Sequence, residues 1–507
     1  MRAGSRKLDR QRQAVQSGTN SHYWCRVAVI KGEAGVDLPR TLDEQLDGLP
    51  LAIELAAART HVLSVSAINA RLEHSLALLS AGPRDQPDRL RSLHAAITWS
   101  YNLLTESTRA VFHRLSVFRG GASLDVIQKV CASRSVDAED GVPDGVFEAI
   151  SELVSHSLVQ RDDGVEEARY TMLETIRDYA AGALRAAGER DVFHQRHAIA
   201  FLELAEQVAP GLGRRDGHLS LQRLELEQHN LRAALSWFVT QGQPTPAMRM
   251  ATALWRYWQM RGHLIEAQER IDEVLGISGG LAVDNRLRLA TVEAAGGIAY
   301  WRGDVVRAEQ TYRDVLAMSR EIDDSAWVAR SLSNLAYALR GVDKADEALV
   351  TAEEALAYFT KIGDRSGEAG ALRLLAILRA GAGELDAAHI AAARAQALFE
   401  ELDQPVDLAW TLRQVGMIHL KKGNPSDARR VLSEALRLFT AARDASSVPV
   451  IMADLASVAR AEGDIEKASM LSQRSRSLQV ATGAEWARIV DRLEHREQTA
   501  RDEQDAT

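Results

Sequence analysis

The stretch Gly383-Glu384-Leu385-Asp386-Ala387-Ala388 belongs to a pattern that returns along the C-terminal half of the chain. In each copy a glycine or aspartate is followed five residues later by an alanine, and successive copies begin 40 residues apart. The other copies are Gly303–Ala308, Asp343–Ala348, Gly423–Ala428 and Gly463–Ala468, and an earlier one, Gly262–Ala267, is displaced by 41. Self-similarity at such a period is typical of repeat architectures, so this pattern decides the fold of the C-terminal half.

A second set of positions keeps the same period. Twelve residues before each of the last five alanines stands a small residue, and an apolar side chain precedes it. The small residues are Gly296, Ala336, Ala376, Gly416 and Ala456. They share one face of a helix with the apolar residues and let a second helix approach closely. The glycine or aspartate ends this helix in a left-handed conformation, which predicts a helix–turn–helix hairpin for each unit.

This pattern resembles the tetratricopeptide repeat (TPR), which also places a small residue twelve positions before a packing alanine. The unit here has 40 residues instead of the usual ~34, so we expect longer helices. Phe359, Phe399 and Phe439, again 40 apart, are expected to pack the second helix against the next hairpin. The alternative is a helical bundle whose periodicity is accidental. Five sets of positions with the same 40-residue period disfavour it. The fold class predicted is mainly α, with a winged-helix domain followed by a TPR-like α-solenoid over residues 249–483.

The composition excludes several classes of protein. The 507 residues are 46% apolar and 26% charged, which is ordinary for about three folded domains. The net charge of −9 gives no global support for nucleic-acid binding. Two cysteines, Cys25 and Cys131, cannot build a disulfide scaffold or a cysteine zinc site. No apolar run reaches the roughly 20 residues of a membrane span and no signal peptide is visible, so we expect a cytoplasmic protein without a membrane partner.

Residues 91–190 show a mixed pattern that predicts a winged-helix domain. The expected helices are 93–104, 107–117, 147–157 and one from Glu174, and the expected strands are 158–161 and 169–173, joined by a loop with Asp163-Gly164. Thr105 is a candidate N-cap of the second helix. Helices followed by a hairpin of strands are the elements of a winged helix.

Five ordered motifs extend from residue 48 to residue 235. They are Gly48–Arg59, Trp99–Leu104, Val117–Gly121, Tyr170–Ala180 and Leu226–Leu235. Together with the repeats they resemble bacterial signal-transduction NTPases of the STAND class, whose nucleotide module is similar to NB-ARC. The resemblance implies a transcriptional or signalling regulator in which nucleotide state controls a repeat-based sensor. In that family the winged helix usually serves as a spacer inside the molecule.

The nucleotide module implied by this resemblance is nearly absent from the sequence. No G-x-x-x-x-G-K-[ST] phosphate loop occurs, and the nearest stretch, Val27–Thr41, has Asp37-Leu38-Pro39 where Gly-Lys-Thr would stand. An acidic residue at that position repels phosphate. Residues 1–47 are also too few for an α/β domain, because each βαβ unit takes about 30 residues or more. The stretch is either a degenerate module or similar by chance, and both interpretations predict no cofactor and no enzyme activity.

These observations divide the chain into six segments. They are a degenerate or disordered N-terminal segment (1–47), a helical remnant of the NTPase module (48–90), the winged-helix domain (91–190), a helical linker domain (191–248), the TPR-like solenoid (249–483) and a charged tail (484–507). No catalytic or metal-binding motif is found in them. His194 and His197 could share a metal ion, but no third ligand is near in the sequence, so an ordinary helix surface is favoured.

The leading hypothesis is a non-catalytic signalling or regulatory protein that binds a partner protein or peptide on the concave face of the solenoid. The first helices of stacked hairpins line such a groove, and arginine and aromatic residues dominate interface energetics. The predicted partner-binding residues are Tyr300, Arg330, Tyr337, Arg340, Arg373, Trp410, Arg413 and Met417. Arg373 and Arg413 are expected to form a cationic ladder for an acidic or C-terminal carboxylate segment.

Two other hypotheses remain. A STAND-class transcriptional regulator could bind DNA directly or through a partner, although the charge distribution does not support direct binding. An active ATPase is disfavoured because the phosphate loop is missing. The sequence does not determine the identity of the partner or the oligomeric state.

Overall fold

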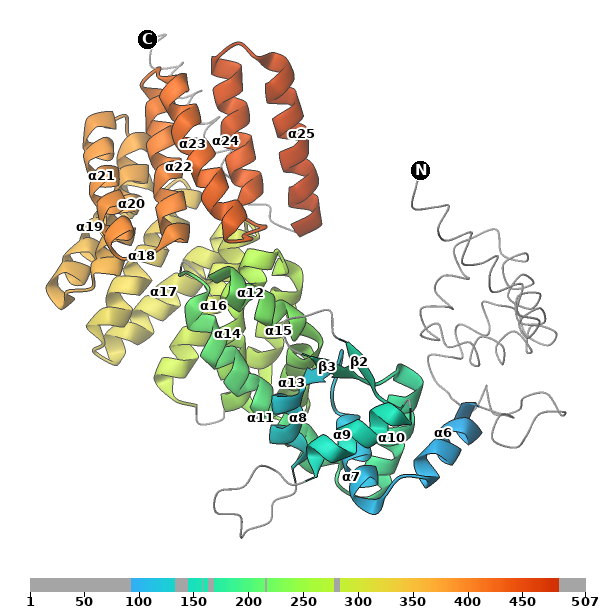
Figure 1. The fold of residues 1–507 in the computed structure, drawn as a ribbon. Helices are drawn as coiled ribbons and strands as arrows, with labels where there is room; N and C mark the ends of the chain where they lie inside the picture. Colours follow the sequence, from blue (N-terminus) through green and yellow to red (C-terminus); the bar gives the residue numbers. More distant parts are fainter. Residues whose placement is uncertain are drawn as a thin grey trace, which may run out of the picture. The chain divides into compact units, whose positions relative to one another are not determined.

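The computed structural model describes residues 93–132, 145–156, 158–162, 168–214, 217–277 and 283–482 (Figure 1). The chain divides into two compact units between Ala200 and Phe201, and each unit is described by itself. Several predictions lie outside the described residues. They concern the segments 1–47 and 48–90, the phosphate-loop-like stretch 27–41, the loop with Asp163-Gly164 and the tail 484–507.

The first unit has the winged-helix topology that the sequence predicted. Its elements are α6 (Leu93–Asn102), α7 (Glu106–Leu115), β1 (Ala122–Ser123), α8 (Leu124–Cys131), α9 (Val146–Ser155), β2 (Gln160–Asp162), β3 (Arg169–Thr171), α10 (Glu174–Ala186) and the first half of α11 (Arg190–Val208). The strand order is β1-β3-β2 with both pairs antiparallel, so that Tyr170 lies between Ala122 and Arg161. Thr105 caps α7 as predicted, because its hydroxyl accepts a hydrogen bond from the Thr108 N–H at 3.3 Å.

Strand β1 and helix α8 were not expected from the sequence. A strand of two residues shows no alternation of apolar and polar side chains, and a helix of eight residues is shorter than the windows in which helical periodicity is visible. Both elements are nevertheless part of the core, since Ala122 and Ile127 are fully buried. Tertiary packing and pairing with β3 therefore stabilise them.

The described part of the second unit consists of helices, which form six successive hairpins after α12 (Gly217–Leu226) and α13 (Gln228–Thr240) (Figure 1). The hairpins are α14 (Pro244–Arg261) with α15 (Leu264–Ile277), α16 (Asn285–Trp301) with α17 (Val305–Glu321), α18 (Ser325–Gly341) with α19 (Ala345–Ile362), α20 (Arg365–Gly381) with α21 (Leu385–Glu401), α22 (Pro405–Lys421) with α23 (Pro425–Ala441), and α24 (Val448–Ala461) with α25 (Ile465–Thr482). Each helix packs chiefly against its neighbours in the sequence. This arrangement is the predicted TPR-like solenoid.

The turn inside each hairpin has the predicted left-handed residue. The positions are Gly262, Gly303, Asp343, Gly383, Gly423 and Gly463, and all have positive φ. A second left-handed position separates consecutive hairpins, at Asp323, Gly363, Asp403 and Arg443. These residues are again 40 apart, but their types differ, so the sequence pattern did not reveal this second turn.

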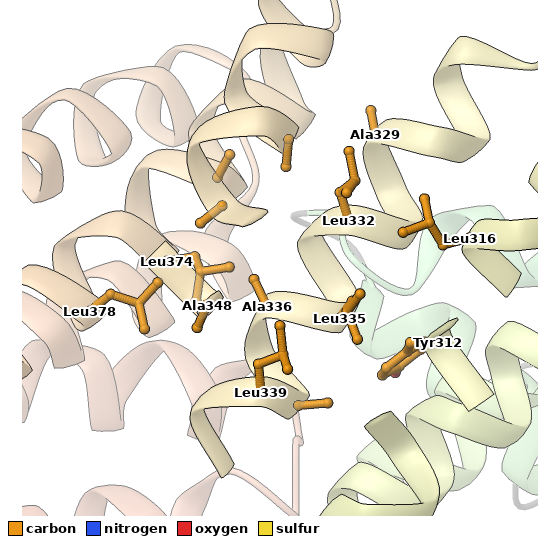
Figure 2. Close-up of a cluster of buried hydrophobic side chains, with 14 of the residues drawn as sticks. Tyr312, Leu316, Ala329, Leu332, Leu335, Ala336, Leu339, Ala348, Leu374 and Leu378 are labelled. Carbon is orange, nitrogen blue, oxygen red and sulfur yellow. The ribbon is translucent and has the colours of Figure 1, made fainter. Parts of the chain in front are cut away.

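The small residues of the repeat lie at helix contacts, as predicted. Ala336 of α18 and Ala348 of α19 are fully buried in one apolar cluster (Figure 2). A Cβ atom added to Gly416 of α22 would stand 2.7 Å from Cγ of Leu432 in α23, so only glycine permits this approach. The three phenylalanines are buried, and a Cβ on Gly367 of α20 would overlap the ring of Phe359. Phe359 therefore packs its helix against the next hairpin.

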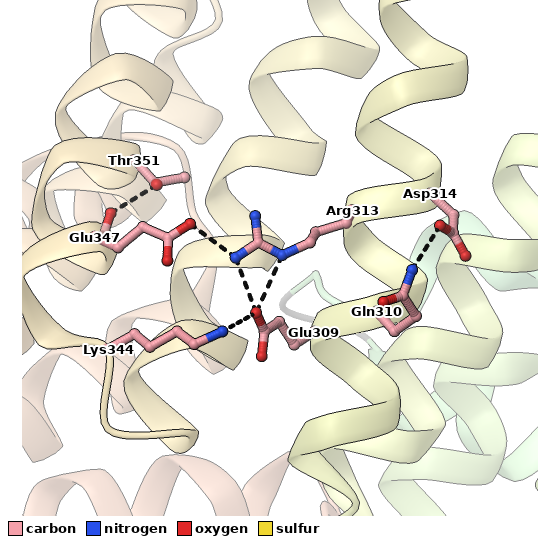
Figure 3. A network of polar contacts seen from close by, with 7 residues as sticks. All are labelled: Glu309, Gln310, Arg313, Asp314, Lys344, Glu347 and Thr351. Atoms are coloured by element: carbon pink, nitrogen blue, oxygen red, sulfur yellow. Dashed lines mark hydrogen bonds and ion pairs between the residues drawn. The ribbon is translucent and has the colours of Figure 1, made fainter.

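Ion pairs also connect consecutive hairpins on the second helices. Arg313 of α17 donates hydrogen bonds to Glu309 at 2.9 Å and to Glu347 of α19 at 2.8 Å, and Lys344 donates to Glu309 at 2.6 Å (Figure 3). Most of these side chains are partly exposed, so each pair adds little stability by itself. They link α17 to the start of α19 in the next hairpin.

The first hairpin also contacts the loop between α23 and α24. The Ala445 N–H donates to the Met260 carbonyl at 2.8 Å, and Nε2 of Gln259 donates to the Ser446 hydroxyl at 2.6 Å. Gln259 and Ser446 are both buried. The solenoid therefore curves far enough for hairpins distant in the sequence to touch.

Candidate functional site

A pocket of ≈200 Å³ lies mainly among the first helices of five consecutive hairpins, α14, α16, α18, α20 and α22, and Tyr312 of the second helix α17 also lines it. It is lined by Trp255, Arg256, Gly297, Tyr300, Trp301, Tyr312, Asn334, Tyr337, Arg340, Arg373, Ile377, Asp407, Trp410, Arg413 and Gln414. Six of the eight residues predicted for partner contact are among them: Tyr300, Tyr337, Arg340, Arg373, Trp410 and Arg413. The pocket is thus on the inner face of the solenoid.

The repeat explains why these side chains converge. Residues 40 apart occupy the same position in successive hairpins, and therefore point to the same side of the solenoid. Tyr300 and Arg340 form one such pair, and Arg373 and Arg413 form another. The curvature of the solenoid then brings side chains of distant hairpins to one place.

Aromatic rings form one wall of the pocket. The rings of Tyr300 and Tyr337 meet edge to face with centroids 6.2 Å apart, and those of Trp301 and Trp410 at 5.6 Å. Both are preferred geometries for aromatic pairs. Val450 of α24 packs against the same group of rings. These contacts join α16 to α22 and α24 and limit the size of the pocket.

Arg373 and Arg413 do not form the open cationic ladder that their spacing suggested, because each is paired with a carboxylate of the chain. Nη1 of Arg373 donates to Asp407 at 3.0 Å, and its Nε donates to the Tyr337 hydroxyl at 3.4 Å. Arg413 makes a bidentate pair with the buried Asp454, at 2.6 and 3.0 Å. Part of the positive charge is thereby neutralised within the protein.

Arg340 and Arg256 differ from these two arginines. Among the residues that the structure describes, neither has a carboxylate partner at ion-pair distance. The Arg256 guanidinium lies over the Trp255 ring at 5.1 Å. Its neighbouring carboxylate, Asp444, is buried and accepts hydrogen bonds from Ser446 and Ser447.

The arginine charges converge on the Tyr300 phenol. Burial raises the pKa of this group, and the charges of Arg340, Arg413 and Arg373 oppose that rise. The three guanidinium groups come from α18, α22 and α20. Arginine side chains from three hairpins thus lie near this phenol, although the chain as a whole carries a net charge of −9.

Arg330 and Met417, the other two predicted residues, do not line the pocket. Arg330 pairs with Glu293 of α16, and its guanidinium lies over the Trp327 ring at 4.5 Å. Met417 is buried in the helical core. Their roles in this structure are packing and ion pairing.

Sequence reasoning missed the pocket residues of the first hairpin. Trp255 stands twelve residues before Ala267, where the later hairpins have glycine or alanine, so the pattern of small residues does not include it. A Cβ added to Gly297 would stand 3.1 Å from the Trp255 ring. Gly297 is in register with Tyr337. The Trp255 ring therefore occupies the space that the side chain at this repeat position takes in the later hairpins. A large residue at a small-residue position was the signal available.

The winged helix offers little positive charge at the position of a DNA-recognition helix. That position belongs to α9, the second helix of the helix-turn-helix. The sequence of α9 contains Glu148 and Glu152 and no lysine or arginine. Glu152 accepts a hydrogen bond from the Thr105 N–H at 3.3 Å and another from the Thr108 hydroxyl. Contacts to phosphate, which dominate affinity for DNA, would therefore need other elements.

The histidines considered for metal binding lie in α11. His197 is buried against Phe118, with ring centroids 5.4 Å apart. Burial lowers the pKa of His194 to about 4. Within the described ranges no group of three histidine, cysteine, aspartate or glutamate side chains is placed to hold a metal ion. Burial also raises the pKa of the Cys131 thiol to about 12.

Comparison with known families identifies both parts of the chain. Residues 104–185 match the winged helix-turn-helix domain, and residues 287–361 match the tetratricopeptide repeat. The chain is 35% identical over 298 residues to a protein of Mycobacterium tuberculosis (strain H37Rv) named as a putative HTH-type transcriptional regulator. That match covers 57% of this chain and 33% of the relative, so the chain spans about a third of the length of these relatives. An uncharacterized protein of the same organism is 38% identical over 171 residues, which cover 33% of this chain and 42% of that one.

Solved structures with similar arrangements include a STAND protein with a tetratricopeptide repeat sensor from Pyrococcus horikoshii. It is 13% identical with a TM-score of 0.42, covering 89% of this chain and 72% of its own. A Rap protein in complex with competence and sporulation factor has a TM-score of 0.41 at 13% identity, covering 60% and 95%. At these scores the two likenesses carry no argument about function.

The resemblance stated from the sequence is confirmed in its parts: a winged helix-turn-helix and TPR repeats in a chain related to proteins named as transcriptional regulators. Among the described helices, none is long and apolar enough to cross a membrane.

Proposed function

We propose that this chain is a non-catalytic, cytoplasmic regulatory protein whose solenoid binds a partner protein or peptide at the pocket on its inner face. The observation that carries this proposal is the convergence of six predicted contact residues, from α16, α18, α20 and α22, on one pocket. Aromatic and arginine side chains are the types that contribute most to binding energy when a partner desolvates them.

A photo-crosslinking experiment tests the proposal. A photoreactive phenylalanine analogue replaces Tyr337 in the pocket or, as a control, the exposed Val350 on α19. Irradiation in cells of the source organism should give a discrete adduct from position 337 and none of that mass from position 350. The same adducts from both positions, or no adduct from position 337, would contradict partner binding in the pocket. Circular dichroism checks that both variants are folded.

The alternative is a transcriptional regulator that binds DNA, supported by the names of the curated relatives. The acidic composition of α9 is an argument against direct binding through this helix. Retention of the full chain on DNA, measured at increasing salt, separates the two hypotheses. A DNA-binding protein should lose affinity steeply as salt rises, because each phosphate contact releases counterions. We expect no such salt-dependent retention.

The absence of catalysis is part of the same proposal. Hydrolysis of ATP requires neutralisation of charge at the transferred phosphoryl group, and the sequence contains no phosphate-loop lysine in the required context. Calorimetric titration with ATP and magnesium should give no saturable heat. A dissociation constant below ~10 μM, which corresponds to about 7 kcal/mol, would contradict this part of the proposal.

A further inference from the structure

The inner pocket combines arginine side chains with aromatic rings. Four guanidinium groups, those of Arg256, Arg340, Arg373 and Arg413, line it together with one carboxylate, Asp407. Asp454, which does not line the pocket, pairs with Arg413 and neutralises its charge. Within the part of the chain that the structure describes, Arg256 and Arg340 have no carboxylate of their own at ion-pair distance, and both line the pocket.

The rings in the pocket provide flat apolar surface beside these charges. They are Trp255, Tyr300, Trp301, Tyr312, Tyr337 and Trp410, six of the 27 tryptophan, tyrosine and phenylalanine residues of the chain. Flat rings pack well on such side chains, in stacked or edge-to-face arrangements. A guanidinium group binds a carboxylate or phosphate through two parallel hydrogen bonds, and this interaction is stronger where water is excluded.

The size of the pocket restricts what can enter. Its volume of ≈200 Å³ is below the ~300–1,000 Å³ typical of pockets for drug-sized ligands. The contact between Trp301 and Trp410 narrows it on one side, and the contact of Met260 with Ala445 keeps the first and fifth hairpins together. A compact ligand, or the terminal residue of a peptide, fits these limits.

We propose that the pocket binds a small organic anion with a flat ring, with the ring against the aromatic wall and a carboxylate group at Arg340 and Arg256. This inference goes beyond the proposed function, because it requires no partner protein. The same chemistry occurs in a free aromatic acid and in the C-terminal aromatic residue of a peptide.

Binding can be measured by calorimetry, on the full chain. The probes are indole-3-acetate, its neutral amide indole-3-acetamide, and cyclohexaneacetate, which keeps the charge but lacks the flat ring. We expect saturable binding of indole-3-acetate at low millimolar concentration or below. The amide and cyclohexaneacetate should each bind about 10-fold more weakly, equivalent to roughly 1.4 kcal/mol. A pentapeptide ending in phenylalanine, with a free or an amidated carboxyl group, distinguishes the peptide source from the free acid.

Matched variants locate the site. Arg340→Gln should weaken binding of indole-3-acetate about 10-fold, Arg340→Lys should weaken it less because the charge remains, and Arg430→Gln on the outer helix α23 should have no effect. Unchanged melting temperatures show that the variants are folded. Equal affinities for the acid and the amide, equal affinities of the 340 and 430 variants, or no saturation by indole-3-acetate would overturn the proposal. Failure of the crosslink at position 337 with intact anion binding would instead remove only the partner-binding function.

Discussion

Ala388 shows at the level of one residue how closely the helices of a hairpin approach. It is fully buried and packs in the apolar cluster that also contains Ala376 of α20. Ala388→Leu should reduce the free energy of unfolding by about 1–3 kcal/mol, because the added atoms overpack the contact. The exposed Glu384→Ala, four residues earlier in the sequence, is the control and should leave it unchanged. Urea unfolding followed by circular dichroism measures both, and equal midpoints would show that the register is wrong.

Glu293 gives folding a pH dependence whose sign follows from its burial. Its carboxylate accepts hydrogen bonds from Arg330 and from Asn334, the latter at 2.8 Å, yet burial raises its pKa above the ordinary 4.5. Since the folded pKa exceeds the unfolded one, the stability it contributes is present below the ordinary pKa and is lost as pH rises through the folded pKa. Glu293→Gln should therefore raise the melting temperature at neutral pH and change it less below pH 4.5.

The exposed Glu401 is the matched control for Glu293. Its hydrogen bonds and ion pair with Arg365 lower the pKa of Glu401, so the stability it contributes is present above the ordinary pKa and is lost as pH falls. Glu401→Gln should thus lower the melting temperature slightly at neutral pH or leave it unchanged. A lower melting temperature of the Glu293→Gln variant at neutral pH would contradict the assignment of a raised pKa.

The sequence was sufficient to find pocket residues that obey the repeat and insufficient for those that depart from it. Tyr300, Arg340 and Arg373 were predicted because a position in one hairpin transfers to the next. Trp255 was missed because it occupies the place of a small residue. The carboxylate partners of the arginines were also not predictable, since Asp407 and Asp454 are 34 and 41 residues away from them in the sequence and no fixed spacing relates the two pairs.

At the level of elements, the turns between hairpins provide a reciprocal test of backbone conformation. Gly363 and Arg443 occupy equivalent positions, with φ of 73° and 54°. A side chain costs about 1–2 kcal/mol in the left-handed region, part of which is offset because glycine has more freedom in the unfolded chain. Gly363→Arg should therefore lower the free energy of unfolding by about 1 kcal/mol, and Arg443→Gly should raise it or leave it unchanged.

Steric overlap does not contribute to the expected change in stability, because a Cβ at Gly363 would meet no neighbouring atom within 4 Å. Chemical denaturation of the two variants and the parent measures the effect. An increase in stability for Gly363→Arg would mean that the turn does not hold its left-handed conformation in solution. The left-handed turn inside each hairpin was predictable because five of its six residues are glycine, whereas the turn between hairpins mixes aspartate, glycine and arginine.

At the level of the whole molecule, the curvature of the solenoid determines whether the pocket exists. Repeat proteins are usually stabilised by interactions within hairpins and between neighbours. Here the first hairpin also contacts the loop after the fifth, through Gln259 with Ser446 and Met260 with Ala445. The sequence could predict the hairpins, but curvature accumulates from small rotations between them. No residue pattern in the sequence therefore predicted the contact between distant hairpins.

This long-range contact predicts an energetic coupling that a solenoid with only neighbour interactions would lack. Gln259 and Ser446 are 187 residues apart and both buried, and Nε2 of Gln259 donates to the Ser446 hydroxyl at 2.6 Å. In a double-mutant cycle, Gln259→Ala and Ser446→Ala should show a coupling energy of about 0.5–3 kcal/mol, because each single change already removes their shared hydrogen bond. Ser319, which bonds with Ser331 at 2.9 Å, shares no partner with Gln259, so the control pair of Gln259→Ala and Ser319→Ala should be additive within about 0.5 kcal/mol. Additivity of the first pair would mean that the contact is open in solution and that the pocket is not held closed by it.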